Sequence, residues 1–337
     1  MRKKNKKKKR KRGYAIIGVV AVAVLASIST VGALNGWFGG GGSVPQDTTT
    51  LKLMGYWNFD EGSGSIAYDA SGLGHHGQLA TYVWVCGTDT VDDVDGNTYN
   101  TVLIGDQCWT VENMRTTKYP NESSITKGDA THGGSGWDTD QAQYSCPPNS
   151  TNNGEDCSAA TTLGMLYQWS AAMNGASSCN GTGSSQPECT NPVQGICPDG
   201  WHIPSHYEWT KLERQICNDN SESDCTVFLY DESTTGWLGY SEGSDMANDV
   251  AAQSWTDYAG GLRQDAHFSD SGLDIPPSGY RYTNGNYYGR SYYAYLWSSF
   301  QYSDTSAWYR RLRYSRTDVY RYYDNRAYGF SVRCLRD

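Results

Sequence analysis

Residues 197–217 read CPDGWHIPSHYEWTKLERQIC and predict a helix with a defined start. Ser205 followed three residues later by Glu208 is a capping box, in which each side chain bonds to the backbone N–H of the other residue. The apolar residues after this cap recur at helical spacing and share one face: Trp209, Leu212 and Ile216. The stretch therefore predicts a helix after Ser205 that packs on a core through this face.

Two histidines in the same stretch invite comparison with a metal site. His202 precedes the cap and His206 falls in the first turn, so the two do not share a helix face. A protein zinc site needs three or four ligands, and no third ligand is apparent nearby. Both histidines are interpreted as structural, and neither a metal nor a cofactor is predicted.

The sequence upstream of the helix predicts strands. Asp95-Gly96-Asn97 lies between Val- and Tyr-rich flanks, which is a hairpin signal, and strand-like sequence follows at residues 98–117. A calcium loop is the alternative interpretation of residues 89–97 (DTVDDVDGN). Because the EF-hand spacing is incomplete and no Glu closes the loop, a turn is favoured.

Residues 120–195 are rich in Gly, Ser, Asn and Cys and are interpreted as loops held by disulfides. One exception is Leu163–Ala172 (LGMLYQWSAA), which is predicted to form a short amphipathic helix.

The ten cysteines indicate an oxidising compartment, because an even number accompanies an export signal and no C-x-x-C pair occurs. About 945 pairings are conceivable for ten cysteines. Spacing favours short loops for three pairs, a hairpin for the fourth and a long closure for the fifth. The expected pairs are Cys146/Cys157, Cys179/Cys189, Cys217/Cys225, Cys86/Cys108 and Cys197/Cys334.

The N-terminus carries the export signal. Residues 1–12 hold ten Lys or Arg, and the uncharged stretch Tyr14–Leu34 follows. About 20 apolar residues span a bilayer as a helix, and the cationic flank stays in the cytoplasm. We expect a single-pass membrane anchor with an extracellular C-terminal part. The alternative is a signal peptide cleaved after Ala33, which would release a secreted protein. Residues 35–52 are interpreted as a flexible linker.

The charge is unevenly distributed along the rest of the chain. Residues 43–279 contain seven Lys or Arg against 32 Asp or Glu, whereas residues 280–337 contain ten Arg against four Asp. Because the bulk of the folded part is acidic, nucleic acid is not expected as a partner.

Several phrases taken together closely resemble the Fibrobacter succinogenes major paralogous domain over residues 88–337. They are DGNTY (95–99), IGDQCW (104–109), CPDGWHIPS (197–205), PSGYR (277–281), LWSS (296–299), AWYR (307–310) and YGFSVRC (328–334). The resemblance implies a C-type-lectin-like fold, which is shared with formylglycine-generating enzymes. The expected class is α+β, loop-rich and disulfide-stapled, preceded by the transmembrane helix. Those enzymes bind copper through a cysteine pair, and residues 290–325 contain no Cys, so the resemblance implies no enzyme activity.

A second resemblance covers residues 53–80 alone. YWNFDEGSG (56–64), DASG (69–72) and His76-Gly77 resemble the opening of a laminin-G or concanavalin-like jelly roll. The fragment supplies two strands, and two strands do not bury a sandwich core. It is interpreted as a truncated hairpin.

The C-terminal 58 residues have a composition typical of binding surfaces. They hold 14 of the 26 Tyr and 10 Arg, but no Lys, Glu or Met. Tyr and Arg dominate binding hot spots, whereas an ordinary solvated face favours Lys and Glu. Strand alternation places Trp308, Arg310 and Leu312 on one side and Tyr309, Arg311 and Arg313 on the other. The predicted ligand-binding residues are Tyr288, Arg290, Tyr292, Tyr302, Asp304, Tyr309, Arg311, Arg313, Arg316, Asp318, Tyr320, Tyr322, Tyr323 and Asn325.

This segment also resembles the variable region of proteins diversified by retroelements. In those proteins, adenines of asparagine-type codons are replaced, which yields Tyr, Asp, Ser, Arg, Thr or Gly but not Lys, Glu, Met or Trp. The resemblance implies outward variable positions on a fixed scaffold that contains Trp297, Trp308 and Phe330.

The sequence thus predicts a surface-displayed binding protein whose extracellular glycan or protein ligand contacts the Tyr- and Arg-rich C-terminal segment. Two alternatives remain open: a secreted enzyme acting on polysaccharide, and a structural module of the cell envelope.

Overall fold

The computed structural model describes residues 66–67, 77–78, 84–129, 137–251 and 253–337, and the chain divides into two units at Val83 and Trp84. In the first unit, β1 (Ile66–Ala67) and β2 (Gly77–Gln78) form an antiparallel pair. The predicted anchor at Tyr14–Leu34, the linker and most of residues 53–80 lie outside the described residues. None of the described helices is long and apolar enough to cross a membrane.

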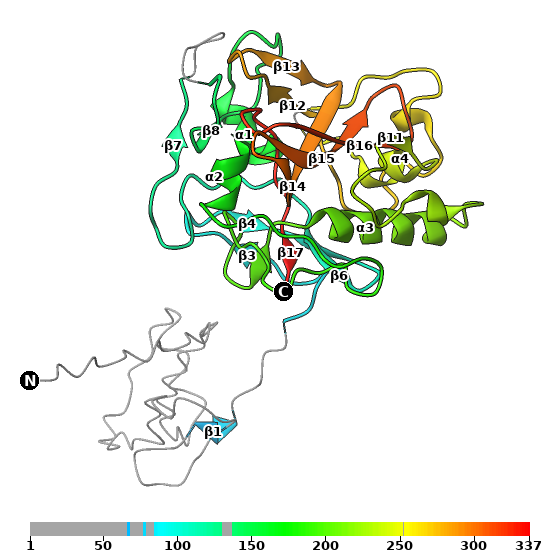
Figure 1. Cartoon of the computed structure of the whole chain (residues 1–337), viewed down its shortest axis with the longest axis horizontal. Helices are drawn as coiled ribbons and strands as arrows, with labels where there is room; N and C mark the ends of the chain where they lie inside the picture. Colours follow the sequence, from blue (N-terminus) through cyan, green and yellow to red (C-terminus); the bar gives the residue numbers. More distant parts are fainter. Residues whose placement is uncertain (1–65, 68–76, 79–83, 130–136, 252) are drawn as a thin grey trace, which may run out of the picture. The chain divides into compact units, whose positions relative to one another are not determined.

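The second unit is built on a six-stranded sheet, and Figure 1 shows its long strands side by side. In spatial order the strands are β11 (Gly236–Leu238), β16 (Val319–Asn325), β15 (Ser306–Arg313), β14 (Tyr293–Ser303), β12 (Ser278–Arg281) and β13 (Tyr287–Arg290). Neighbours are antiparallel except β12 and β14, which are parallel. Most of the Tyr- and Arg-rich segment therefore forms adjacent strands of one sheet.

A second sheet joins the C-terminus to the start of this unit (Figure 1). Its order is β10 (Trp201–His202), β17 (Leu335–Arg336), β6 (Gln107–Thr110) and β5 (Thr101–Ile104). The remaining short strands are β3 (Val91–Asp92) with β4 (Thr98–Tyr99), and β7 (Thr126–Lys127) with β8 (Gln143–Ser145) and β9 (Leu166–Tyr167).

The β3–β4 hairpin has the turn that its sequence predicts. The Asp93 carboxylate accepts hydrogen bonds from the backbone N–H groups of Asp95 and Asn97, both at 2.9 Å, and from the Tyr99 hydroxyl at 2.7 Å. Its oxygens are thus engaged by the turn itself.

The helix predicted after Ser205 is confirmed as α3 (His206–Asp219). Its capping box is complete, because the Ser205 hydroxyl accepts from the Glu208 N–H and the Glu208 carboxylate accepts from the Ser205 N–H. Trp209, Leu212 and Ile216 are buried, as the spacing predicts. They pack beneath the sheet against Leu296 of β14, Leu312 of β15 and Val319 of β16.

The single helix predicted over Leu163–Ala172 is wrong. The chain forms α1 (Ala160–Leu163), the strand β9 and then α2 (Trp169–Met173). Gly164 ends α1 with φ of +78° and ψ of 179°, a conformation almost restricted to glycine. Among the described residues, the other short helices are α4 (Glu242–Met246) and three 3₁₀ turns at Cys157–Ala159, Cys225–Val227 and Leu262–Gln264.

The six-stranded sheet carries a core on each face. One core lies between the sheet and α3, and the other contains Tyr295, Trp297, Tyr309 and Phe330. Five disulfides support this arrangement, in the same pairs that spacing favours: Cys86–Cys108, Cys146–Cys157, Cys179–Cys189, Cys197–Cys334 and Cys217–Cys225. The unit is therefore rich in sheet and loop, with few helices.

Candidate ligand-binding face

Strands β15 and β16 point alternate side chains to opposite faces of the sheet. On β15, Trp308, Arg310 and Leu312 are buried toward α3. Arg311 points the other way and lies opposite Tyr320 of β16 in the strand register. Alternation thus places the side chains as the sequence predicts, but both faces are partly covered.

The predicted ligand-binding residues divide into three groups by exposure. Six are exposed: Tyr288, Tyr292, Tyr302, Asp304, Arg316 and Asn325. Five are half-buried: Arg311, Arg313, Tyr320, Tyr322 and Tyr323. Three are buried: Arg290, Tyr309 and Asp318.

The buried arginine in this set has a structural role. Nη1 of Arg290 bonds the Asp156 carboxylate at 2.9 Å and the Pro148 carbonyl at 3.0 Å, and its Nε bonds Gln253 at 2.6 Å. These bonds tie β13 to the loop closed by Cys146–Cys157. Because the guanidinium is used inside the protein, Arg290 is removed from the candidate site.

Tyr309 and Asp318 are also poorly placed to contact a ligand. The Tyr309 ring is 3% exposed and packs on Tyr295 and Phe330, with ring centroids 5.5 and 5.1 Å away. Burial raises the pKa of its hydroxyl well above the ordinary value. Asp318 is held by Arg316 through two hydrogen bonds of 2.5 and 2.7 Å, so this carboxylate is already paired.

Half of the arginines of the C-terminal segment are internal. Five of its ten arginines are buried: Arg281, Arg290, Arg310, Arg321 and Arg333. Arg333 illustrates their use, since its guanidinium bonds the carbonyls of Thr110, Leu273 and Asp274 at 2.9, 2.7 and 3.1 Å. The planar guanidinium holds its N–H donors in a fixed geometry, which suits it to linking several loops through their carbonyls. Composition alone had suggested a more uniformly basic surface.

Arg311 lies at the centre of the remaining group. Its guanidinium carbon is 4.0 Å from the centroid of the Tyr320 ring and 5.0 Å from that of Trp237, and Nη1 bonds the Tyr295 hydroxyl at 3.3 Å. Such stacking attracts a cation to the ring face and holds the side chain in place. Arg313 follows two residues later on the same side of β15 and approaches Tyr293 at 5.9 Å.

Neither Arg311 nor Arg313 has a carboxylate within ion-pair distance among the described residues. The neighbouring arginines differ, because Arg316 and Arg326 are paired with Asp318 and Asp140. Two guanidiniums without an ion-pair partner, two residues apart on the same side of β15, are suited to binding an anionic group.

Sequence reasoning missed two members of this region. Trp237 of β11 pairs with Tyr320 across the strands, at a ring distance of 4.9 Å. Gly236 and Gly239 on either side of it weaken the strand signal of this stretch. Asp324 follows Tyr322 on the same side of β16; burial raises the pKa of its carboxyl, and the positive charge of Arg311 opposes this. We define the Tyr/Arg face as Arg311, Arg313, Tyr320, Tyr322 and Trp237.

The other exposed candidates belong to separate surroundings. Tyr288 packs on Tyr280 and Tyr282, and Tyr292 packs edge-on against Tyr314. Asp304 and Asn325 lie at the β14–β15 turn and at the end of β16. The Tyr/Arg face therefore contains four of the fourteen predicted residues: Arg311, Arg313, Tyr320 and Tyr322.

Two hollows lie away from the Tyr/Arg face. One of about 380 Å³ is lined by residues 173–174, 176–177 and 191–195, and one of about 210 Å³ by residues 92–94, Pro120 and residues 196–199. Neither includes a member of the face.

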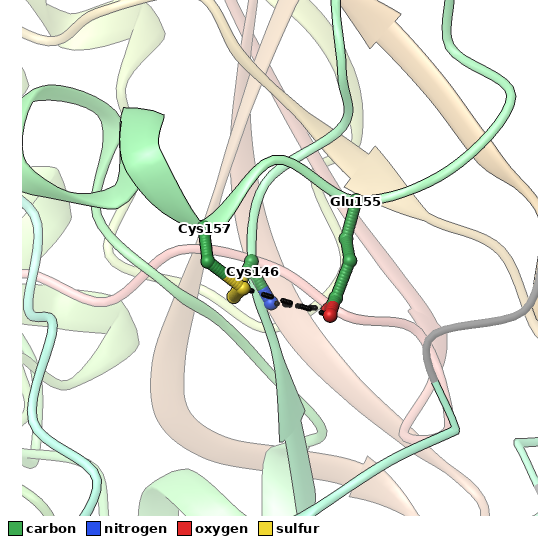
Figure 2. Close-up of side chains that lie close together, drawn as sticks. All are labelled: Cys146, Glu155 and Cys157. Carbon is green, nitrogen blue, oxygen red and sulfur yellow. Dashed lines mark hydrogen bonds between the residues drawn. A yellow bond between two sulfur atoms is a disulfide. The ribbon is translucent and has the colours of Figure 1, made fainter.

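A cluster of potential metal ligands is structural. Figure 2 shows Cys146, Glu155 and Cys157, whose ligand atoms lie within 4.8 Å of one another. The two sulfurs form a disulfide, and metal binding requires thiolates. Glu155 accepts a hydrogen bond from the Cys146 N–H at 3.2 Å and pairs with Lys127 at 2.5 Å. Its charge is thus balanced by Lys127 of β7.

The two histidines near α3 are held apart by different partners. The His202 ring bonds Asp337 at 2.6 Å and Glu208 at 2.9 Å. His206 bonds the Asp231 carbonyl at 3.0 Å, and its other ring nitrogen lies 3.2 Å from Arg310. Since Arg310 can only donate, that nitrogen accepts and the ring is neutral. Burial, together with Arg310 and Arg321, lowers the pKa of His206.

A family model described as the Fibrobacter succinogenes major domain matches residues 102–336. This range contains the six-stranded sheet, α3 and the whole Tyr/Arg face. No curated protein and no solved structure matches the chain.

Proposed function

We propose a binding function for this chain, which belongs to the Fibrobacter succinogenes major domain family. In this proposal the protein is displayed outside the cell, where its Tyr/Arg face binds a glycan or protein ligand. The supporting observation is the pair Arg311 and Arg313, which lack a carboxylate partner among the described residues while aromatic rings hold Arg311 in position.

An extracellular location agrees with the covalent structure. Five disulfides are typical of proteins that mature outside the cytoplasm, and all ten cysteines are engaged in them. The proposal includes the N-terminal membrane anchor and a C-type-lectin-like arrangement of the second unit. Diversification of the C-terminal segment, if it occurs, would be confined to its exposed positions, because substitution of the buried arginines would leave buried carbonyl and carboxylate groups unpaired.

Binding accounts for the face better than catalysis does. A glycoside hydrolase needs two carboxylates on either side of the cleaved bond. The five residues of the face are cationic or aromatic and, among the described residues, have one carboxylate, that of Asp324, beside them. They are suited to holding a ligand by stacking and charge-assisted hydrogen bonds.

The test is to probe the full-length chain with an array of neutral polysaccharides, acidic polysaccharides and bacterial envelope extracts. We expect at least one probe to be retained, and the double variant Arg311→Gln/Arg313→Gln to weaken that binding by about tenfold or more, since two charge-assisted hydrogen bonds are lost. Tyr320→Ala removes the ring under Arg311 and should weaken it as well.

Two matched variants serve as controls. Arg336→Gln removes an exposed arginine of the four-stranded sheet, whose guanidinium stacks on Trp84. Tyr258→Ala removes a tyrosine that is 50% exposed and lies outside the face. Retention of every bound probe by the Arg311/Arg313 variant, or the same loss in the controls, would contradict the proposal.

A further inference from the structure

Two tyrosine rings from strands that are not neighbours lie face to face. Tyr302 is near the end of β14 and Tyr323 is on β16, and β15 runs between these two strands. The ring centroids are 3.4 Å apart and the ring planes differ by 8°. Among the ring pairs of the described residues, this pair has the shortest centroid distance and the smallest angle between planes.

The surrounding chain supports this stack. Trp308 of β15 is fully buried and packs edge-on against both rings, with centroids 6.0 Å from Tyr302 and 5.3 Å from Tyr323. The Arg326 guanidinium donates to the Asp304 carbonyl at 3.1 Å, which ties the turn after β14 to the segment after β16. The pair is therefore held from below and at the turn, while Tyr302 remains 48% exposed to solvent.

Face-to-face phenols have the arrangement from which oxidative coupling proceeds. A tyrosyl radical carries its unpaired electron in a π orbital perpendicular to the ring, with high density on the ortho carbons beside the C–O bond. Two such radicals therefore form a bond from ring face to ring face.

The orientation of the two rings also fits this reaction. A hydrogen bond with the Tyr302 hydroxyl raises the pKa of the Tyr323 hydroxyl to about 12, so the two C–O groups lie on the same side of the stack. Since the rings are nearly parallel, their ortho carbons lie at a separation similar to that of the centroids. Reacting atoms are poised for a bond when they are held about 3–3.5 Å apart with their orbitals aligned.

We propose that Tyr302 and Tyr323 are a site of oxidative cross-linking to dityrosine, with hydrogen peroxide as the oxidant and a haem peroxidase as the catalyst. Each phenol loses one electron and one proton, and hydrogen peroxide takes up the two electrons and two protons to give two water molecules. The two radicals then form one C–C bond between ortho carbons. Each of these carbons releases its hydrogen as a proton, and each phenol oxygen is protonated again.

Other groups of the chain compete poorly for the oxidant. All ten cysteines are in disulfides, so no free thiol is oxidised first. Tyr322 covers the second face of Tyr323 at 9°, but its centroid is 4.7 Å away. Tyr258 is 50% exposed and lies 5.5 Å from Tyr314, but their planes differ by 87°, so an edge rather than a face is presented.

The cross-link would join β14 to β16 across β15 and close the intervening chain into a loop. A covalent closure of this kind stabilises a folded chain, mainly by constraining the unfolded state. The site is separate from the proposed binding function, because neither Tyr302 nor Tyr323 belongs to the Tyr/Arg face.

The experiment treats the full-length chain, at low concentration, with a haem peroxidase and hydrogen peroxide. We expect dityrosine fluorescence, the loss of two hydrogen atoms from the intact mass, and a linked peptide pair that contains Tyr302 and Tyr323 after digestion. The treated chain should also unfold at a higher temperature than the untreated chain. Tyr302→Phe keeps the ring but cannot form the phenoxyl radical, so it should abolish the linked pair and the gain in unfolding temperature.

Tyr258→Phe is the matched control, because it removes an equally exposed hydroxyl from an edge-on pair and should leave the yield of the linked pair unchanged. Equal urea midpoints of the untreated chains would show that both variants fold. The proposal is overturned if no dityrosine forms, if the main link joins Tyr322 to Tyr323, or if Tyr258→Phe lowers the yield as much as Tyr302→Phe does.

Discussion

Arg310 on β15 and Glu213 on α3 form an ion pair that is closed off from solvent between the sheet and its covering helix. Arg310 is 1% exposed and Glu213 is fully buried. The same guanidinium also bonds the His206 carbonyl at 3.2 Å and the Thr210 hydroxyl at 3.3 Å. A charge in this position is tolerated only while its partner is present.

Glu213→Gln is therefore expected to lower the free energy of unfolding by about 3–5 kcal/mol, because it leaves an uncompensated buried guanidinium. Urea denaturation followed by tryptophan fluorescence measures the change. Lys211→Gln is the control on the same helix: its partners Asp106 and Glu188 are exposed, and its loss should cost about 1 kcal/mol or less. Equal losses in the two variants would argue against this account.

His202 is expected to make stability depend on pH. Burial alone would lower the pKa of His202, but hydrogen bonds from its ring to Asp337 and Glu208 raise it to about 9. Because this exceeds the ordinary value of about 6.5, the stabilisation is complete below pH 6.5 and is lost as the pH rises through 9. An upper bound is roughly 3 kcal/mol, reduced by the exposure of Asp337.

The measurement is the urea midpoint of the wild-type chain and of His202→Gln between pH 6 and 9. The wild-type midpoint should fall across this range, and that of the variant should fall less. A wild-type midpoint that rises from pH 6.5 to 9 relative to the variant would show that the folded-state pKa is not raised.

The disulfides should contribute unequally to stability. Cys197–Cys334 closes 137 residues and Cys217–Cys225 closes 8. In the chain-entropy model the first contributes about 5 kcal/mol and the second about 2.5 kcal/mol. Paired Cys→Ser variants, compared by thermal unfolding, should show the larger loss for the long closure. The opposite order would indicate that the loop at the end of α3 matters more than the tie to the C-terminus.

Local signals predicted local structure well. The capping box and the spacing of Trp209, Leu212 and Ile216 specify α3 without help from distant residues. Alternation also oriented β15 correctly. Alternation could not predict that the face of β15 opposite α3 is covered. Phe330 and Tyr295 belong to other parts of the chain, and they pack on Tyr309 and bury it.

Distant partners also explain why only part of the candidate site could be predicted. An arginine on a strand looks the same in sequence whether it meets a carboxylate, as Arg290 meets Asp156, or a ligand. The partners lie more than a hundred residues away, so composition overstated the basic surface. Trp237 was missed because it joins Tyr320 through strand pairing that no local pattern reveals.

A substitution at Gly164 distinguishes the observed break from a continuous helix over residues 163–172. The two structures predict changes in stability of opposite sign. At Gly164, φ is +78°, and an added Cβ would lie 2.4 Å from Cβ of Asn113. Gly164→Ala is expected to destabilise the protein by about 2–4 kcal/mol through backbone strain and overpacking. Gly175→Ala is the matched control: φ is +71° and no atom lies within 4 Å, so strain alone should cost about 1 kcal/mol.

Thermal and urea unfolding of both glycine variants measures these losses. If residues 163–172 formed one continuous helix, Gly164→Ala would instead stabilise the protein by about 1 kcal/mol, since alanine favours helix over glycine. A larger loss at Gly164 than at Gly175 supports the break between α1 and α2, because only at Gly164 does a close neighbour add to the strain.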